Sequence, residues 1–335
     1  MQHLLVILSI LILVVSCSDN HEITLPDDRV EIPSGFPDME FPEDNPYSKE
    51  AWALGKALFY DPILSADSTV SCASCHLPEL AFSDGLKTSI GIHDRIGRRN
   101  SPSLANIGYH PYFTREGGVP TLEMQVLVPI QEHDEMDFNI VLVAERLKRN
   151  SYYSQASVDA YQRPPDAFVI TRALANFERS LISGNSKYDA FLRGDAQLTA
   201  EENRGRQLFH SEALNCSSCH SGFNFTDYRF TNNGLYEEYE DPGRERLTND
   251  PLDEALFKTP SLRNVAITGP YMHDGSISTL NEVIDHYQNG GFGHRNQSPL
   301  IKAFNLSNSD RDALVAFLNC LTDYEFINND LFKEE

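Results

Sequence analysis

The sequence predicts an all-α fold built from two similar halves, and three observations support this fold class. The block Gly55-Lys-Ala-Leu-Phe59 returns as Gly205-Arg-Gln-Leu-Phe209, and each copy ends an amphipathic stretch with helical spacing. Apolar stripes with helical spacing close both halves, at residues 173–182 and 313–318. No alternating run is long enough for a useful strand, whereas Gly and Pro punctuate long loops. We therefore expect one helical unit to occur twice.

Residues 1–17 predict export of the chain. The apolar run from Leu4 to Val15 is too short to cross a bilayer and is typical of the core of a signal peptide. Val14-Val15-Ser16-Cys17 resembles a lipobox, in which Cys17 becomes a lipidated N-terminus, although His3 is the only chargeable side chain ahead of the run. We expect a lipid-anchored protein rather than a plainly secreted one.

Two copies of Cys-x-x-Cys-His carry the clearest chemical signal: Cys72-Ala-Ser-Cys75-His76 and Cys216-Ser-Ser-Cys219-His220. Two thiols at this spacing can form thioether bonds to one haem, and the histidine that follows them then binds the iron. A lone Cys-x-x-Cys is also typical of a redox dithiol or half of a zinc site. Because a histidine follows each pair and both copies share their upstream block, we predict two covalently bound c-type haems.

The haem motifs divide the chain into two expected cytochrome-c-like domains, at residues 47–195 and 196–335. Large loops are expected because a haem substitutes for much of each core. Residues 18–46 are rich in Pro, Asp and Glu, which predicts an extended tether or surface wrap. Thr199-Ala-Glu-Glu202 is a capping box and predicts a helix start, and the last apolar stripe follows Ser309-x-x-Asp312.

The net charge narrows the classes of partner, and one cysteine remains outside the haem motifs and the lipobox. A net charge of −22 makes nucleic acid and anionic membrane surfaces poor partners. We interpret the acidic excess as a solvated surface rather than a field that steers a basic electron donor. Of the six cysteines, Cys320 has no assigned role, and we expect a buried apolar thiol in a terminal helix.

Several blocks in order resemble the bacterial di-haem cytochrome c peroxidase and MauG family over nearly the whole mature chain. The blocks are Phe82-Ser-Asp-Gly85, Arg99-Asn-Ser-Pro-Ser-Leu-Ala-Asn106, Thr121-Leu-Glu-Met-Gln125, Pro129-Ile130, Glu135-Met136, Lys258-Thr-Pro-Ser-Leu-Arg-Asn264, Gly269-Pro-Tyr-Met-His-Asp-Gly275 and Thr279-Leu280. The resemblance implies a peroxidase, with a catalytic haem at His76 and an electron-transfer haem at His220.

The resemblance also implies the residues beside the catalytic haem. A peroxidase needs a group that moves a proton between the two peroxide oxygens, and the family's glutamate and glutamine fall on Glu135 and Gln125. From spacing alone, both would be ordinary surface polar residues. In typical peroxidases a distal histidine closes this iron, but the matching position is Ile92, followed by His93. Either His93 binds the iron or the site stays open, and we favour the open site.

At the second haem, the other axial ligand is a methionine in the peroxidases and a tyrosine in MauG. The matching position here is Tyr287, with Met272 and His286 as competing candidates. A phenolate-type ligand should lower the reduction potential relative to methionine. His273 is expected to lie near this haem without binding its iron.

Two further family features concern the space between the haems. The family has a tryptophan relay there, but the only tryptophan of this chain is Trp52, and the expected place reads Tyr112-Phe-Thr-Arg-Glu-Gly-Gly118. Tyr112, Phe113 or Tyr109 could substitute, or the haems could couple directly. The family also holds a calcium ion through oxygen ligands. The matching positions in this chain are Asn100, Thr268 and Pro270.

The leading functional hypothesis is a di-haem peroxidase that reduces hydrogen peroxide with electrons from a small c-type cytochrome or a cupredoxin. The alternatives are a MauG-like oxidase acting on a protein or organic substrate, and a non-catalytic di-haem electron carrier. Tyr287 and the missing distal histidine favour the oxidase, whereas the missing tryptophan opposes it. Glu135 and Gln125 oppose the carrier. The resemblance further implies a periplasmic location and a homodimer.

Overall fold

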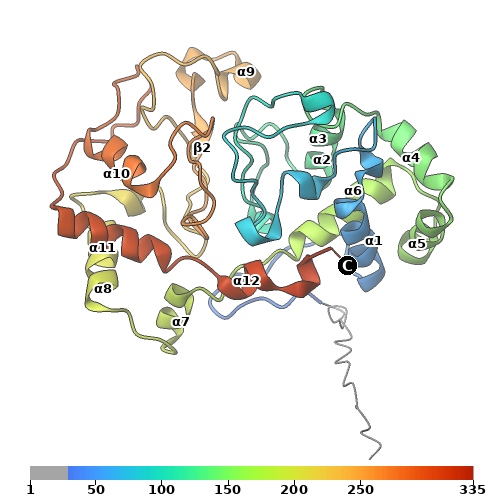
Figure 1. Cartoon of the computed structure of the whole chain (residues 1–335), viewed down its shortest axis with the longest axis horizontal. Helices are drawn as coiled ribbons and strands as arrows, with labels where there is room; N and C mark the ends of the chain where they lie inside the picture. Colours follow the sequence, from blue (N-terminus) through green and yellow to red (C-terminus); the bar gives the residue numbers. More distant parts are fainter. Residues whose placement is uncertain (1–28, 335) are drawn as a thin grey trace, which may run out of the picture.

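The computed structural model describes residues 29–334, and the signal peptide, the lipobox with Cys17 and the start of the tether lie outside this range. Two helical units lie side by side and are connected by long loops (Figure 1). This arrangement confirms the expected all-α class. Within residues 29–334, no helix is both long and apolar enough to cross a membrane.

The first unit, on the right of Figure 1, contains the helices up to residue 179. They are α1 (Lys49–Tyr60), α2 (Leu122–Gln125), α3 (Leu127–Gln131), α4 (Ile140–Lys148), α5 (Ser151–Tyr161) and α6 (Ala167–Arg179). Helices α1 and α6 pack together at its centre. Trp52 is fully buried there, and its indole N–H donates a 2.7 Å hydrogen bond to Ser180 Oγ. The tryptophan is therefore a core residue of this unit.

The second unit contains the later helices and one short antiparallel strand pair. They are α7 (Lys187–Arg193), α8 (Ala200–Phe209), α9 (Glu245–Thr248), α10 (Leu280–Gln288), α11 (Asn308–Asn319), β1 (Phe230–Thr231) and β2 (Phe257–Lys258). The last helix, α12 (Tyr324–Asn328), packs against the first unit. Helix α8 begins at the predicted capping box, with Thr199 as the N-cap. Helix α11 is capped by Ser307, two residues before the Ser309-x-x-Asp312 pattern. Ser307 is the better cap because its hydroxyl accepts from the N–H of Asp310.

The sequence repeat corresponds to a repeated helix crossing. Gly55 of α1 lies against the backbone of Ala173 in α6, and a Cβ at Gly55 would be 2.0 Å from the Ala173 carbonyl oxygen. In the second unit, Gly205 of α8 meets Ala313 of α11 in the same way, at 1.8 Å. Each pair of helices thus approaches at backbone contact, which only glycine permits.

Replacing Gly205 by alanine should destabilise the protein by about 3 kcal/mol or more, because the new methyl group forces α8 away from α11. Helix propensity alone would favour alanine by about 1 kcal/mol. Denaturant unfolding of Gly205→Ala beside Gln207→Ala, an exposed position on the same helix, measures the difference. Equal stability of the two variants would contradict the backbone contact.

A second repeated feature is a buried asparagine that holds the chain after the closing helix of each unit. Asn106 and Asn264 both have φ of 60°, and both are buried. The Asn106 backbone N–H donates to Leu181 O, while its side-chain oxygen accepts from the N–H of Ser183. In the same manner, the Asn264 N–H donates to Leu321 O and its side-chain oxygen accepts from Asp323. Each asparagine therefore fixes the chain that leaves the closing helix of its unit.

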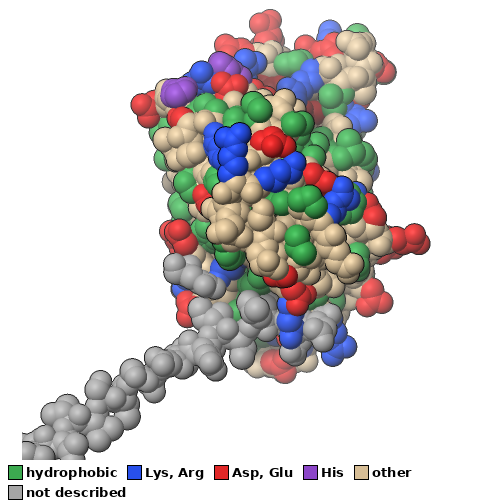
Figure 2. All heavy atoms as spheres, turned by 90° about the vertical axis from the view of Figure 1, so that its right-hand side faces the viewer, with side chains coloured by type: hydrophobic (Ala, Val, Ile, Leu, Met, Phe, Trp, Pro, Cys, Tyr) green, Lys and Arg blue, Asp and Glu red, His purple; other side chains and the backbone are tan. Residues whose placement is uncertain are grey.

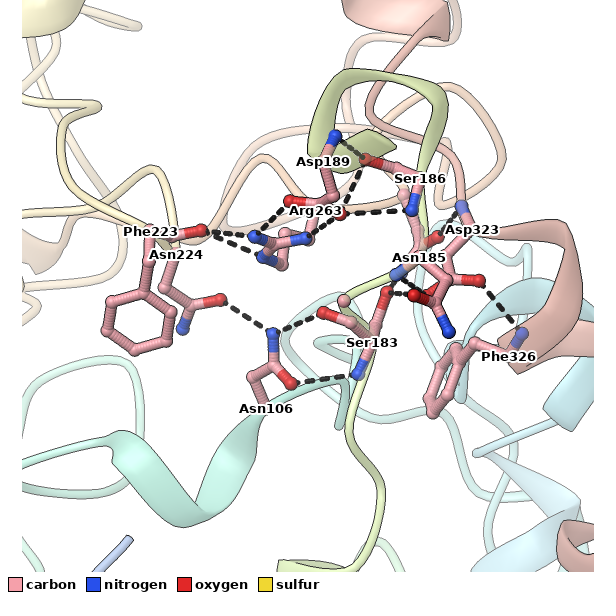
Figure 3. Close-up of polar contacts among 12 residues, drawn as sticks. Asn106, Ser183, Asn185, Ser186, Asp189, Phe223, Asn224, Arg263, Asp323 and Phe326 are labelled. Atoms are coloured by element: carbon pink, nitrogen blue, oxygen red, sulfur yellow. Dashed lines mark hydrogen bonds and ion pairs between the residues drawn. The ribbon is translucent and has the colours of Figure 1, made fainter. Parts of the chain in front are cut away.

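Buried polar contacts connect the two units around Asn106 (Figure 3). The Asn106 amide donates to Ser183 O at 2.9 Å and to Asn224 Oδ1 of the second unit at 3.1 Å. Nearby, the Arg263 guanidinium donates to both carboxylate oxygens of Asp189, at 2.8 and 2.9 Å. The Asn106–Asn224 hydrogen bond crosses from one unit to the other, whereas the Arg263–Asp189 pair holds two segments of the second unit together.

The hydrophobic core is divided between the two units. Tyr188 packs in the core of the second unit, while Phe326, Ile327 and Phe332 pack in the core of the first. Tyr188 falls within the expected first range, 47–195, and Phe326, Ile327 and Phe332 fall within the expected second range, 196–335, so each packs in the core of the other unit. The C-terminal segment returns to the first unit, as α12 shows in Figure 1. Cys320 is buried at the end of α11, as predicted.

The described part of the proline-rich segment lies along the surface of both units. The Phe36 ring is 4.7 Å from the ring of Phe223 in the second unit and 6.1 Å from that of Tyr109 in the first. Asn45 is fully buried and donates to Glu123 Oε1 at 2.7 Å. Residues 29–46 thus form a wrap that covers the junction of the units.

The face on the side of α4 and α5 has mixed polarity (Figure 2). Basic, acidic and hydrophobic side chains are interspersed on it. The exposed apolar side chains of these helices are Val141, Leu142, Tyr152 and Val158. The negative net charge therefore does not form a single-sign field on this face.

Candidate functional site

Both Cys-x-x-Cys-His motifs form the same local structure, a single 3₁₀ turn at Cys72–Ser74 and at Cys216–Ser218. The N–H of the second cysteine donates to the carbonyl of the first, at 3.2 Å for Cys75 and 3.3 Å for Cys219. None of the four thiols is in a disulfide.

The two motif histidines are held in one tautomer. His76 Nδ1 lies 2.7 Å from Phe82 O, and His220 Nδ1 lies 3.1 Å from Phe225 O. Because a carbonyl oxygen can only accept, each Nδ1 carries a proton and each Nε2 keeps its lone pair. Burial lowers the pKa of both imidazoles and so keeps them neutral. A neutral imidazole with an anchored Nδ1–H is the arrangement of a metal-binding histidine.

The thiols themselves fit covalent attachment better than redox or zinc chemistry. Burial raises the pKa of Cys75 to about 11 and that of Cys216 to about 12, so neither is a reactive thiolate. Across residues 29–334, no group of three or more His, Cys, Asp or Glu side chains could hold a metal ion. The residues present therefore fit one thioether-bound haem at each motif.

Glu135 lies near the first motif, where its charge acts on both Cys72 and Cys75. Burial, together with the neighbouring charges of Glu132 and Asp134, raises the pKa of Glu135 to about 7. A carboxyl that titrates near neutral pH can both accept and return a proton.

The turn that carries Glu135 is clamped by the preceding loop. The N–H of Ile92 donates to Glu135 O at 2.8 Å, and a Cβ at Gly91 would be 2.1 Å from Asp134 O. The Arg95 guanidinium donates to His133 O and to Asp137 Oδ2, each at 2.7 Å. These contacts hold the Glu135 backbone in one place.

His93 and Gln125 occupy contrasting surroundings. The His93 side chain is 59% exposed and lies 3.4 Å from the Asp67 carboxylate, while Ile92 before it is buried in the core. Gln125 ends α2, and its Oε1 is buried with no hydrogen-bond partner in the described part of the chain. Buried acceptors are nearly always paired, so a bound group that donates to this oxygen would account for it.

Tyr287 of α10 lies near the second motif, where Cys216 and Cys219 act on its pKa. Burial raises that pKa to about 12, against a hydrogen bond from the Asn233 amide. Asn233 Nδ2 also donates to Met272 Sδ at 3.1 Å, so Tyr287 and Met272 approach the same side chain. His286 Nε2 is engaged 3.0 Å from Asn233 O.

The positions that the resemblance assigns to calcium lie in two loops that meet close to the first motif. Ser101 Oγ donates to Cys75 O at 2.8 Å, and the N–H of Asn100 donates to His273 O at 2.9 Å. Thr268 and Pro270 are partly buried in the loop that leads to His273. Asn100 accepts hydrogen bonds from the Arg115 guanidinium.

Two of the three aromatic residues proposed to replace the tryptophan, Tyr112 and Tyr109, lie where the units meet. The Tyr112 ring stacks on Phe230 at 5.1 Å, and its hydroxyl donates to Tyr228 O at 2.7 Å. Phe113 is buried in the first core, and the Tyr109 ring is 4.9 Å from that of Phe223. Tyr112 and Tyr109 thus both contact the second unit.

Sequence reasoning missed three residues that hold this site together: Arg95, Arg115 and Asn233. Each acts on a backbone carbonyl or side chain far away in the chain, and no local pattern marks such a pair. One missed signal was readable. Ser-Pro-Ser-Leu-Ala-Asn106 returns as Thr-Pro-Ser-Leu-Arg-Asn264, and the two asparagines have the same role.

Two helical units, each with a thioether motif and an anchored histidine, define the chain as a di-haem protein of the cytochrome c class. Residues 49–197 match the family model described as di-haem cytochrome c peroxidase, and residues 202–322 match the one described as cytochrome c. The chain belongs to the di-haem cytochrome c peroxidase and MauG family, and its cofactors are two haems.

Relatives of both kinds resemble the chain over most of its length. The methylamine utilization protein MauG of Methylorubrum extorquens is 41% identical over 286 residues, which covers 84% of this chain and 80% of that protein. The cytochrome c551 peroxidase of Pseudomonas aeruginosa is 30% identical over 288 residues, covering 83% and 80%. A solved MauG-like protein associated with microbial copper homeostasis has a TM-score of 0.87 at 36% identity, covering 91% of this chain and 98% of that one.

Proposed function

We propose that the protein is a peroxidase that reduces hydrogen peroxide with electrons from a small c-type cytochrome or a cupredoxin. The observation that carries this proposal is Glu135, a carboxyl near the first motif whose pKa is raised to about 7. A protein that only carried electrons would have no use for such a group.

In this reaction hydrogen peroxide takes up two electrons and two protons and yields two molecules of water. When bound, the haems supply the iron and the electrons. The ionised Glu135 accepts a proton from one peroxide oxygen and returns it to the other, which then leaves as water. Gln125 orients the peroxide through its side-chain oxygen Oε1, which accepts a hydrogen bond from it. The clamp of Gly91, Ile92 and Arg95 keeps Glu135 in place.

The first iron is proposed to stay open in the oxidised protein. The position that would carry a blocking histidine is Ile92, which is buried in the core. His93 is turned toward Asp67 at the surface. Peroxide could then bind without a preceding reduction step.

Electron paramagnetic resonance of the fully oxidised protein tests this function. We expect one high-spin ferric signal from the open haem at His76 and one low-spin signal from the haem at His220. With a reduced c-type cytochrome as donor, added peroxide should be consumed with the oxidation of two donor molecules for each peroxide. Two low-spin signals and no peroxide consumption would identify an electron carrier.

A MauG-like oxidase is the second candidate, and Tyr287 favours it through its place beside Cys216 and Cys219. In that reaction peroxide takes its two electrons from a protein or organic substrate instead of a cytochrome. The two candidates separate in one assay. The peroxidase turns over with a reduced cytochrome alone, whereas the oxidase needs the substrate.

The proposed location of the protein is the periplasm. Covalent haem attachment in bacteria takes place outside the cytoplasm, which agrees with a signal peptide at residues 1–17. We propose a periplasmic protein, anchored through a lipid on Cys17 and active as a homodimer.

A further inference from the structure

Asn100, the side chain that the resemblance assigns to calcium, does not fit a calcium ion, because a guanidinium already occupies both of its oxygens. Arg115 Nη2 donates to Asn100 O at 2.6 Å and to Asn100 Oδ1 at 2.9 Å. Arg115 Nε donates to Asn100 O at 3.2 Å. Both oxygens that Asn100 could offer to a metal are thus bound to one planar cation.

Calcium and this guanidinium exclude each other. A calcium ion binds oxygen ligands at about 2.3–2.6 Å and needs six to eight of them. It would occupy the space in which Arg115 reaches Asn100, and the positive charge of Arg115 would repel it.

The carboxylates around Arg115 are engaged elsewhere. Asp274, Glu116 and Asp241 act on Arg115 through their charge. Glu116 accepts from Arg99 and Arg246, and Asp241 accepts two hydrogen bonds from Arg99 at 2.6 and 2.9 Å. Asp274 accepts from the Tyr236 hydroxyl at 2.7 Å. A divalent ion placed here would therefore find no carboxylate without a partner.

The guanidinium of Arg115 takes the place that a structural metal ion would have, because it binds a residue at which several chain segments meet. Asn100 joins three chain segments, because its N–H donates to His273 O and its side-chain amide donates to Leu86 O. The carbonyl of Arg115 accepts from the N–H of Lys258 in the second unit. Arg115 thus connects the segment that leads to Ser101 and His76 with the segments of the second unit.

We propose that the guanidinium of Arg115 is the resident cation between the two haem sites and replaces the calcium ion of the family. The planar fork of arginine matches two oxygens on one residue, here the backbone and side-chain oxygens of Asn100. The protein therefore holds its active arrangement without calcium.

Metal analysis of the holoprotein tests the proposal directly. The protein, purified in calcium-containing buffer and then desalted, should contain two irons and no stoichiometric calcium. Excess EGTA should leave its melting temperature and both electron paramagnetic resonance signals unchanged. One calcium ion per chain, or loss of a haem signal on chelation, would overturn the proposal. Neither readout depends on peroxidase activity, so the result stands apart from the proposed function.

Variants then test the role of the charge. Arg115→Gln should lower the melting temperature, and millimolar calcium should restore a few degrees, because the Asn100 oxygens are then free. Arg115→Lys keeps the positive charge and should need no calcium. Arg204→Gln is the control, since Arg204 is a surface arginine whose ion pair is with Asp310. Identical behaviour of Arg115→Gln and Arg115→Lys would contradict the proposal, and if Arg115→Gln does not fold, the metal analysis decides alone.

Discussion

Glu135→Gln should lower kcat/KM for hydrogen peroxide by about 10²–10⁴-fold, the range that a positioned acid/base group contributes. Glutamine has nearly the same shape and keeps the backbone contacts of Ile92 with this turn, but it cannot accept a proton. The loss should therefore appear in turnover, while the ferric spectra of both haems stay as in the wild type. Stopped-flow mixing with peroxide and a reduced cytochrome measures the effect.

The pH profile gives a second readout of the same residue. Because the ionised form of Glu135 accepts the first proton, wild-type kcat/KM should rise as the pH passes through about 7, the raised pKa of this carboxyl. The profile of Glu135→Gln should be flat in this region. The matched control is Glu132→Gln, which removes a negative charge that raises the Glu135 pKa. Its inflection should therefore move to lower pH with turnover preserved.

The same pKa shift predicts the sign of a stability effect. The folded-state pKa of Glu135 is about 7, above its ordinary value of 4.5, so the folded protein binds this proton more tightly than the unfolded chain does. This contribution is fully present below about pH 4.5 and is lost as the pH rises to 7. The melting temperature of Glu135→Gln minus that of the wild type should therefore be more positive at pH 8 than at pH 5, as thermal melts at the two pH values would show.

For the turnover prediction, the contradicting outcome is full peroxide turnover by Glu135→Gln, which would remove Glu135 from the reaction.

Tyr287→Met should raise the midpoint potential of the haem at His220 by on the order of a few tenths of a volt, because axial ligands set haem potentials over about 0.8 V. A phenol oxygen favours ferric iron, whereas a thioether favours the ferrous form. Tyr287 lies near Cys216 and Cys219, and Asn233 binds its hydroxyl, so a methionine there would approach the same place. Spectroelectrochemical titration measures the potential, and the low-spin ferric signal should change at the same time.

Two further variants make this test specific. Tyr239→Phe removes another hydroxyl close to Tyr287 and should leave the potential unchanged. Met272→Leu removes the thioether that Asn233 binds and should also have little effect on the potential. If the potential of Tyr287→Met equals that of the wild type and Met272→Leu shifts it, Met272 is the ligand and the tyrosine is a packing residue.

The cofactor class and the helical repeat were predictable because their signals are local. A Cys-x-x-Cys-His motif places both thiols and the imidazole within one turn of chain, so its chemistry survives in any fold. The Thr199 capping box likewise fixed the start of α8 from four consecutive residues. The start of α11 could not be predicted in this way, because Ser307 and Ser309 are both good caps and local sequence does not distinguish them.

The candidate site was predictable only where a family pattern named its side chains. Glu135 and Tyr287 could be chosen by resemblance, but not their surroundings. The carbonyl that anchors His76 belongs to Phe82, and the guanidinium that clamps the Glu135 turn belongs to Arg95. Backbone oxygens carry no side-chain signature, so a sequence cannot show which of them turns toward a buried group.

The sequence by itself determined the two haem sites, their histidine ligands and the helical repeat, since each depends on residues close together in the chain. Tertiary structure decided the position of His93 at the surface, the meeting of Tyr287 with Asn233, and the binding of Asn100 by Arg115. These features join segments 15 to 54 residues apart or depend on a loop's direction. Only the folded chain brings such charges and oxygens within hydrogen-bond distance.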